Sequence, residues 1–340
     1  MPSKVAINGL GRIGRAALKL AVEQPQLELV AVNEIGSLEN MVYLLRYDSV
    51  YGRYERRVEA VDGKLVIDGK PLVYLSERDP GQLPWADLEI DLVLECTGRF
   101  TNREDAEKHV RAGARWVVLS GPTSSPDVPT IIHGVNRPDG QTQIISCASC
   151  TTNNITPLVE ILDRHFGVEK AVLTTVHAYT ATQALVDSPG GAKDLRRGRA
   201  AAQSFVPSST GAATATAKAL PAMKGRFDGV SVRGPVVVGS ISDVVFVVTR
   251  DTTADEVNDV LRQEASSDQY QGILGVADEP LVSADIAKDP RASIVQLDMT
   301  RVVGGNLVKV MSWYDNEWGF TNQMIQVAVQ QLGLHTGARV

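Results

Sequence analysis

The chain has 340 residues, of which 44% are hydrophobic and 22% charged, and its formal net charge is −6. This composition is typical of a globular protein and excludes a coiled coil, a collagen-like repeat and a disordered chain. Because the net charge is negative, the chain lacks the overall basic character of a nucleic-acid-binding protein, and we expect no nucleic-acid partner. At about 150 residues per domain, this length predicts two domains.

The start of the chain and its cysteines predict where the protein works. Residues 1–8 contain no long apolar stretch before a cleavage site, so we expect no signal peptide. No run approaches the roughly 18 apolar residues that span a membrane. The cysteines, Cys96, Cys147 and Cys150, are a sparse and odd-numbered set, which fits a reducing compartment. We therefore expect a cytoplasmic protein with no membrane partner.

Strands and helices alternate in the first half of the chain. A helix is expected at 15–23, and a second one follows the capping box from Thr101 to Glu104 and ends at Gly113. Apolar runs predict strands at 4–8, 27–33, 91–96, 115–120 and 143–146. This alternation predicts a parallel sheet with helical crossovers.

The second half has a less regular rhythm. A capping box at Thr253 and Glu256 predicts one helix, and residues 322–332 predict another near the end of the chain. Strand-like runs cover residues 229–233, 241–249, 293–300 and 306–314. We expect an α+β domain here with a mainly antiparallel sheet.

A glycine-rich motif stands between the first predicted strand and the first predicted helix. Residues 9–14, Gly-Leu-Gly-Arg-Ile-Gly, match G-x-G-x-x-G in the context that identifies a dinucleotide-binding loop. Glu34 lies 20 residues after Gly14, where an acidic residue can bind the adenosine ribose. Its carboxylate would repel a 2′-phosphate and so favours NAD, although NADP use stays open because the basic segment 193–199 can reach a phosphate. The first domain is thus predicted to be a Rossmann-type parallel-sheet α/β domain.

Cys150 is the candidate nucleophile. It follows the predicted strand at 143–146, and four apolar residues at helical spacing between 155 and 162 predict a helix that begins close to it. The N–H groups and dipole at a helix N-terminus lower the pKa of a thiol, so we expect an acidic and reactive Cys150. His177 ends the next apolar run and is the candidate base, provided that its strand lies beside the Cys150 segment.

At this point the chain resembles a known family, phosphorylating glyceraldehyde-3-phosphate dehydrogenase. The resemblance rests on six segments in chain order, of which the one around Cys150 is the most specific. These segments are Asn8–Arg15, Tyr47–Val50, Leu94–Gly98, Ala148–Asn153, Ser209–Ala213 and Trp313–Glu317.

The resemblance implies a reaction and a domain plan. The Cys150 thiolate would attack the aldehyde, His177 would take the proton as hydride passes to NAD, and inorganic phosphate would release the thioester as an acyl phosphate. The implied domains are 1–149 for the dinucleotide, with a C-terminal helix 316–340 packing back on it, and 150–315 for catalysis. The loop at 187–202 resembles a tetramer-interface loop, so a homotetramer is implied.

The resemblance also implies the remaining site residues. A phosphorylated aldehyde would be held through its phosphate by Thr180 and Arg233, and the attacking phosphate by Ser149, Thr151, Thr210 and Gly211. The candidate cofactor-binding residues are Gly9, Gly11, Arg12, Ile13, Gly14, Glu34 and Ser120, with Asn316 binding the nicotinamide carboxamide. No metal site is predicted.

Some positions depart from the family pattern and leave alternatives open. Glu34 stands where the family usually has Asp and also resembles erythrose-4-phosphate dehydrogenases; Gly234 and Val236 alter the segment after Arg233. Cys147 creates a C-x-x-C pair with Cys150, and we hypothesise a reversible disulfide between them. Two other functions stay open: an aspartate-semialdehyde or acyl-phosphate reductase, and a non-catalytic cofactor-binding regulator.

Overall fold

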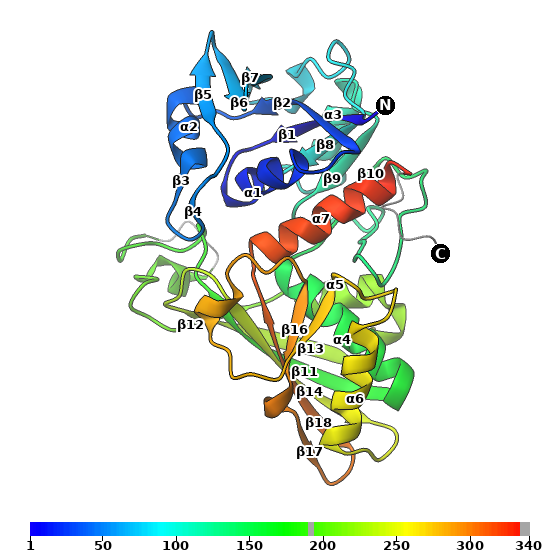
Figure 1. Cartoon of the computed structure of the whole chain (residues 1–340). Coiled ribbons are helices and arrows are strands. Elements are labelled where there is room, and N and C mark those ends of the chain that lie inside the picture. The colour runs from blue at the N-terminus through cyan, green and yellow to red at the C-terminus, as the bar shows by residue number, and fades with distance from the viewer. Residues whose placement is uncertain (190–193, 334–340) are drawn as a thin grey trace. The chain divides into compact units, whose positions relative to one another are not determined.

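The computed structural model describes residues 1–189 and 194–333, and its contacts divide the chain into two units (Figure 1). The first unit holds Met1–Ile131, Arg137–Ala148 and the chain from Met324 onward. The second holds Ile132–Asn136 and Ser149–Gln323. The predicted combination of a mostly parallel α/β sheet and a second, mainly antiparallel sheet is confirmed.

The first unit is built on a sheet in the order β10-β9-β8-β1-β2-β7-β6-β5. The strands from β10 to β7 pair in parallel, whereas β5, β6 and β7 pair antiparallel. Its strands are β1 (Ser3–Asn8), β2 (Leu27–Asn33), β3 (Tyr47–Asp48), β4 (Gly52–Arg53), β5 (Val58–Val61), β6 (Lys64–Ile67), β7 (Lys70–Leu75), β8 (Leu92–Glu95), β9 (Trp116–Leu119) and β10 (Ile144–Ser146). Its helices are α1 (Arg12–Ala21), α2 (Leu38–Arg46) and α3 (Arg103–Arg111), with the 3₁₀ turn η1 (Pro80–Gln82).

Neither the helix α2 nor the strands β3 and β4 are predicted from the sequence, and the elements of this unit differ from the sequence prediction in three further places. The helix expected at 15–23 begins at Arg12, because Gly11 is already its N-cap. The helix α3 is capped by Asn102, whose side chain accepts a hydrogen bond from the Asp105 N–H, and not by Thr101. The antiparallel strands β5 to β7 were not expected, although Asp-Gly pairs with positive φ connect them at residues 62–63 and 68–69, as in tight hairpins.

The second unit contains a sheet in the order β12-β13-β11-β14-β18-β16-β15, with β17 paired to β18. Only the pairs β11–β13 and β15–β16 are parallel. Its strands are β11 (Val168–Ala178), β12 (Val206–Ser209), β13 (Phe227–Gly234), β14 (Ser240–Val248), β15 (Leu274–Ala277), β16 (Ser293–Gln296), β17 (Arg301–Val303) and β18 (Leu307–Tyr314). Its helices are α4 (Cys150–Phe166), α5 (Ala212–Ala219) and α6 (Ala254–Ala265), with 3₁₀ turns η2 (Leu195–Gly198), η3 (Pro221–Met223), η4 (Ser283–Ile286) and η5 (Leu297–Met299).

Two predicted elements of the second half differ from the structure by four residues at one end. The strand expected at 293–300 ends at Gln296, because the chain turns there into η5. The last helix, α7 (Trp318–Gln331), begins four residues before the predicted start and runs from the second unit into the first. The predicted C-terminal helix at 316–340 includes residues 334–340, which lie outside the described residues.

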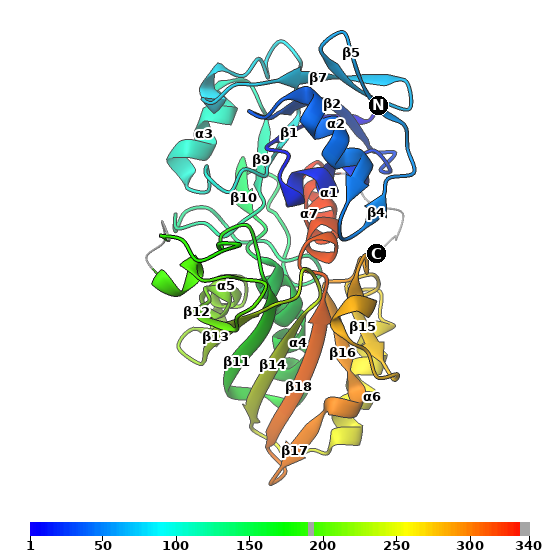
Figure 2. The same cartoon turned by 90° about the vertical axis from the view of Figure 1, so that its left-hand side faces the viewer.

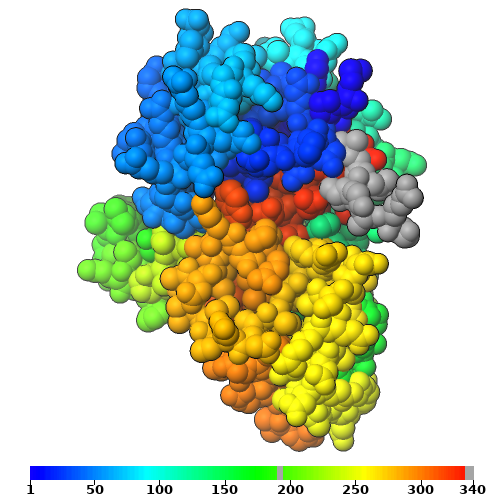
Figure 3. Space-filling model, viewed as in Figure 1, coloured from blue at the N-terminus to red at the C-terminus, as the bar shows by residue number. Residues whose placement is uncertain are grey.

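The two faces of the second sheet are covered differently. The helices α4, α5 and α6 pack on one face and bury the apolar core. The helix α6 forms part of the outer surface (yellow in Figure 3), since only one stripe of it, including Val257 and Leu261, is buried. Figure 2 shows β11, β14 and β18 with α4 behind them. On the face of the sheet opposite the helices, Val172 and Val230 are 54% and 53% exposed. Within the described residues, no helix combines the length and apolar character needed to cross a membrane.

Candidate active site

The glycine loop of the first unit has the geometry that its motif predicts. Gly9 has a φ of 91°, a conformation that side chains disfavour. A Cβ on Gly14 would lie 1.8 Å from the Gly9 carbonyl oxygen, so α1 packs directly on the loop. Gly11 has no heavy atom within 4 Å of a Cβ position, which leaves its backbone open to a ligand. The three glycines therefore serve the turn, the close approach and the helix packing of a dinucleotide loop.

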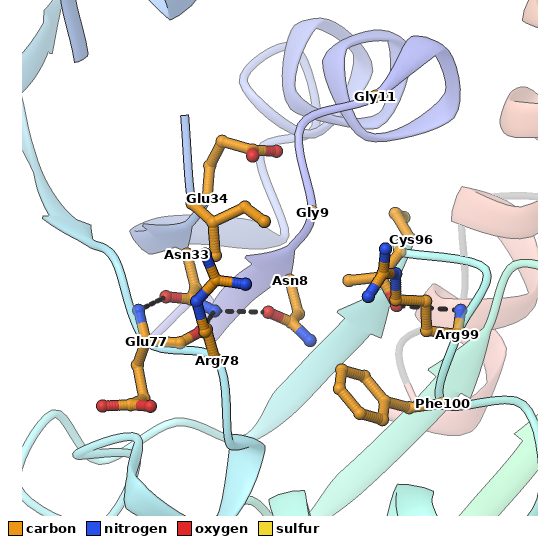
Figure 4. Close-up of a pocket in the computed structure, with 12 residues that line it drawn as sticks. Asn8, Gly9, Gly11, Asn33, Glu34, Glu77, Arg78, Cys96, Arg99 and Phe100 are labelled. Atoms are coloured by element: carbon orange, nitrogen blue, oxygen red, sulfur yellow. Dashed lines mark hydrogen bonds between the residues drawn. The ribbon is translucent and has the colours of Figure 1, made fainter. Parts of the chain in front are cut away.

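A pocket of about 270 Å³ lies at the carboxyl ends of the parallel strands β1, β2, β7 and β8 of the first unit (Figure 4). It is lined by Asn8, Gly9, Gly11, Asn33, Glu34, Ile35, Glu77, Arg78, Cys96, Thr97, Arg99 and Phe100. The Glu34 carboxylate accepts hydrogen bonds from the Leu10 N–H at 2.7 Å and the Gly36 N–H at 3.0 Å. These two amides fix the acidic group at the pocket, where its remaining lone pairs can accept from ribose hydroxyls. The residues present therefore fit a dinucleotide.

Not every cofactor candidate lies in this pocket. The Arg12 side chain forms an ion pair with Asp48 at 2.6 Å, and neither Ile13 nor Ser120 is a lining residue. Asn316 belongs to the second unit. Conversely, sequence reasoning missed the lining residues that follow β7 and β8, among them Arg78, Arg99 and Phe100. The rule that ligands bind beyond the carboxyl ends of parallel strands was the signal that could have found them.

Cys150 is the first residue of α4 in the second unit. The Ser149 hydroxyl caps this helix by accepting a hydrogen bond from the Thr152 N–H at 3.2 Å. The Cys150 Sγ lies 3.3 Å from the Nε2 of His177, which stands near the end of β11 and is 3% exposed. The structure thus brings the predicted nucleophile and base within hydrogen-bond distance.

Arg233 lies on the other side of the His177 ring. It is opposite His177 in the parallel pair of β11 and β13, which sets the two side chains next to each other. Its Nη1 is 2.7 Å from His177 Nδ1 and 3.3 Å from the Ala178 carbonyl oxygen, and that oxygen is itself 2.7 Å from Nδ1. Within residues 1–189 and 194–333, no carboxylate pairs with Arg233. The guanidinium is therefore a half-buried cation without an anionic partner, beside the thiol.

The electrostatics of the pair differ from the sequence expectation. Burial raises the pKa of the Cys150 thiol above its usual range, and the Arg233 charge and hydrogen bonds from Thr151 only partly oppose this. Burial and the Arg233 charge lower the pKa of His177 to about 3. The expectation of an acidic Cys150 is thus wrong for this form, because the helix N-terminus is outweighed by desolvation. Thiol and imidazole are both neutral here, so the thiol must lose its proton to Nε2 during attack.

Tyr314 supports this pair and was not assigned a role from the sequence. Its hydroxyl lies between the Thr151 hydroxyl at 2.9 Å and the Thr175 hydroxyl at 2.8 Å. Its ring meets the His177 ring edge-on, with centroids 5.8 Å apart. The Thr151 hydroxyl therefore links Tyr314 to the Cys150 thiol, to which both this hydroxyl and the Thr151 backbone N–H are hydrogen-bonded.

The remaining phosphate candidates lie on two segments of the second unit. The Thr180 hydroxyl contacts the Thr182 hydroxyl at 3.0 Å, just beyond β11. Thr210 and Gly211 precede α5, where Gly211 is the N-cap and the Thr210 hydroxyl accepts from the Ala212 N–H at 3.2 Å. Hydroxyls and N–H groups at a helix N-terminus are suited to an oxyanion.

Asn316 is held in one orientation by a buried serine. The Ser240 hydroxyl donates to Asn316 Oδ1 at 3.1 Å and accepts from the Ala178 N–H at 3.0 Å. Because Oδ1 is engaged, the amide NH₂ of Asn316 is the group available to donate to a ligand.

The cysteines carry no disulfide among the described residues. Cys96, Cys147 and Cys150 are each reduced and not cross-linked, and burial raises the pKa of Cys147. A disulfide between Cys147 and Cys150 therefore stays a hypothesis about an oxidised form.

Comparisons with known proteins agree along nearly the whole chain. Residues 3–103 match the family described as glyceraldehyde 3-phosphate dehydrogenase, NAD binding domain, and residues 149–316 match its C-terminal domain. Glyceraldehyde-3-phosphate dehydrogenase 2 of Streptomyces avermitilis is 44% identical over 333 residues, covering 97% of this chain and 98% of the relative. The glyceraldehyde-3-phosphate dehydrogenase of Zymomonas mobilis is 45% identical with the same coverage, and glyceraldehyde-3-phosphate dehydrogenase 2 of Bacillus subtilis is 43% identical over 96% of both chains. With a glycine loop, a Cys–His pair and these matches, the chain belongs to the glyceraldehyde-3-phosphate dehydrogenase family.

Proposed function

We propose that this chain catalyses the NAD-dependent oxidation and phosphorylation of D-glyceraldehyde 3-phosphate to 1,3-bisphosphoglycerate. The observation that carries the proposal is the 3.3 Å contact between Cys150 Sγ and His177 Nε2 at the start of α4. The adjacent Arg233 supports a phosphorylated substrate, because a cation without a carboxylate partner is suited to a phosphate group.

Cys150 and His177 divide the first half of the reaction. Sγ attacks the aldehyde carbon as its proton passes to Nε2, and Nε2–H then gives that proton to the former carbonyl oxygen, which leaves a neutral hemithioacetal on Cys150 and a neutral His177. NAD, when bound, supplies the nicotinamide ring that accepts a hydride. His177 then takes the hydroxyl proton of the hemithioacetal as the C–H bond breaks, which leaves a thioester on Cys150.

Arg233 determines which ring nitrogen of His177 carries the proton, and therefore whether His177 can act as a base. A guanidinium can only donate and a carbonyl can only accept, so Nδ1 either accepts from Arg233 or donates to Ala178. When the substrate phosphate draws Arg233 away, Nδ1–H donates to the Ala178 oxygen and the lone pair lies on Nε2, facing sulfur. Phosphate binding at Arg233 and Thr180 would thus activate His177.

The second half of the reaction releases the product. Inorganic phosphate attacks the thioester carbon, an acyl phosphate forms, and Sγ leaves as a thiolate. The residues proposed to hold the attacking phosphate are Ser149, Thr151, Thr210 and Gly211, which lie at the N-termini of α4 and α5. Backbone N–H groups there can bind both the anion and the developing negative charge.

The two units are proposed to share the work as predicted, with NAD bound in the first and the chemistry performed in the second. Glu34 would bind the adenosine ribose, and Asn316 would donate to the nicotinamide carboxamide through the NH₂ that Ser240 leaves available. The three cysteines form no disulfide among the described residues, as is usual in a reducing compartment, and this supports the expected cytoplasmic location.

A homotetramer is proposed because the second sheet has one open apolar face. Val172 on β11 and Val230 on β13 are more than half exposed, and Val176 is 38% exposed. An exposed apolar sheet face of this kind is typical of a subunit interface. A second copy of the chain is the expected occupant.

The test is an assay of NADH formation with glyceraldehyde 3-phosphate and NAD, with and without phosphate. We expect turnover that needs phosphate and that is lost in Cys150→Ala. Turnover at the same rate without phosphate, or faster turnover of erythrose 4-phosphate, would instead favour the erythrose-4-phosphate dehydrogenase reading. Absence of turnover with intact NAD binding would favour a regulator.

A further inference from the structure

Three neighbouring strands of the first unit end in buried polar side chains. Glu95 ends β8, Asn8 ends β1 and Asn33 ends β2, and these side chains are 1%, 1% and 4% exposed. Asn8 Nδ2 donates to Glu95 Oε2 at 2.6 Å, and Asn33 Nδ2 donates to Asn8 Oδ1 at 2.7 Å. Asn33 also bonds both the N–H and the carbonyl oxygen of Glu77 (Figure 4). The side chains thus form one hydrogen-bonded row across the strand ends.

The row continues into the segment after β8 and into the helix α3. Glu95 Oε1 accepts from the Thr97 N–H at 2.7 Å and from the Thr97 hydroxyl. His109 Nε2 on α3 lies 3.0 Å from Glu95 Oε2, and His109 Nδ1 lies 3.0 Å from the indole Nε1 of Trp85. Both His109 and Trp85 are completely buried. Neither residue takes part in the proposed chemistry.

The donors and acceptors of this network determine where its protons are. An indole N–H can only donate, so His109 Nδ1 must accept, and the imidazole carries its proton on Nε2. Nε2–H then donates to Glu95, converging with Asn8 Nδ2, which lies 3.4 Å from it. The Glu95 side chain receives four donors in all, one from Asn8, one from His109 and two from Thr97. Trp85 therefore fixes the tautomer that completes the set of donors around Glu95.

This network forms one wall of the nucleotide pocket. Asn8, Asn33, Glu77 and Thr97 all line the pocket. Thr97 also packs on the glycine loop, since a Cβ on Gly9 would lie 2.8 Å from Thr97 Cγ2. A change at Glu95 would move both Thr97 and Asn8, and through them the shape of the pocket.

We propose that Trp85 and His109 are positioning residues for nucleotide binding, acting through Glu95 on the pocket wall. The inference rests on the proposed function only in assigning the pocket to NAD. Trp85→Phe removes the one N–H that makes Nδ1 an acceptor; His109 can then carry its proton on Nδ1 and turn a lone pair toward the Glu95 carboxylate. Glu95→Gln places an amide NH₂ among four donors.

The test measures the Kd for NAD and for ADP-ribose by calorimetry in the full chain. We expect the Kd to rise about tenfold in Trp85→Phe and further in Glu95→Gln, because a buried hydrogen bond to a charged group is lost or reversed. Trp116→Phe is the matched control, since Trp116 lies on β9 of the same sheet but outside the network, and its Kd should stay within about twofold of the parent.

A second readout separates positioning from a loss of stability. The rate at which iodoacetamide alkylates Cys150 without nucleotide, and kcat at saturating NAD, report on the second unit and should change little in Trp85→Phe. Urea midpoints are measured for each variant. Parental Kd values in folded Trp85→Phe and Glu95→Gln would overturn the inference. Absence of NAD binding by the parent chain would instead overturn the proposed function.

Discussion

Replacing Arg233 with methionine isolates the role of one charge, because methionine keeps much of the length and volume of the side chain. The Arg233 guanidinium contacts His177 Nδ1 at 2.7 Å and has no carboxylate partner among the described residues. Two unit charges about 4 Å apart attract by about 4 kcal/mol at an effective dielectric constant of 20. Part of this is offset when Arg233 leaves His177 and Ala178. About 1.5–3 kcal/mol should remain, the usual value of a hydrogen bond to a charged group.

That energy predicts a loss specific to phosphorylated substrate. The kcat/KM of Arg233→Met for glyceraldehyde 3-phosphate should fall about 10- to 150-fold, mostly through KM. For unphosphorylated glyceraldehyde kcat/KM should not fall, because this substrate has no phosphate for Arg233 to bind and loss of the guanidinium leaves His177 Nδ1 free to donate to Ala178. The assay is initial-rate NADH formation with both aldehydes.

The control is Arg226→Met in the same unit. The Arg226 guanidinium bonds the backbone oxygens of Ala222 and Val168, at the start of β11, which is the end opposite His177. Arg226→Met should therefore leave the ratio of the two kcat/KM values unchanged. An equal loss with both aldehydes in Arg233→Met would refute the assignment of Arg233 to the substrate phosphate.

Four further predictions follow from the same geometry. Cys150→Ala should abolish turnover while calorimetry still detects NAD binding, and His177→Asn should lower kcat about 10²–10⁴-fold; equal activity of either variant and the parent would exclude the Cys–His mechanism. Because the pKa of His177 is lowered from 6.5 to about 3, the unfolded chain binds this proton first as pH falls below 6.5. The free energy of unfolding should then lose up to about 1.4 kcal/mol per pH unit down to pH 3, a slope that denaturant titrations of His177→Asn should lack. Glu34→Ala should raise the ratio of kcat/KM with NADP to that with NAD at least about tenfold, since it removes a charge that repels a 2′-phosphate; a constant ratio would contradict this. Val230→Asp should dissociate the proposed tetramer in analytical ultracentrifugation, whereas Val61→Asp, at an exposed valine of the first unit, should not.

The parts of the site that sequence could predict depend on short segments. The glycine loop needs six consecutive residues between a strand and a helix, and the Ser149 cap places Cys150 at a helix N-terminus by local hydrogen bonding alone. The apolar run that precedes His177 is likewise local, and it predicts this residue at the end of a strand. These segments do not determine whether β11 lies near α4. The 3.3 Å contact between Cys150 Sγ and His177 Nε2 shows that the folded chain brings the two elements together.

The thiol shows where local reasoning gives the wrong sign. The helix N-terminus does lower the pKa of Cys150 through Thr151, as the sequence suggested. The side chains near the buried thiol include His177, Arg233 and Tyr314, which lie 27, 83 and 164 residues after it in the chain. Because burial depends on these distant segments, its larger and opposite effect could not be deduced from residues 143–162.

The nucleotide pocket shows the same limit in a different form. Asn8 and Asn33 are recognisable in the sequence as the last residues of apolar strands, and Glu95 is the second-last residue of the strand predicted at 91–96, yet nothing local says that they share hydrogen bonds. The order β8-β1-β2 sets them side by side, since parallel strands in register end at one edge of the sheet. A buried carboxylate surrounded by neutral donors is costly unless every donor is present. A network of this kind is therefore sensitive to the position of a single proton, and loss of Trp85, which does not itself line the pocket, should weaken nucleotide binding.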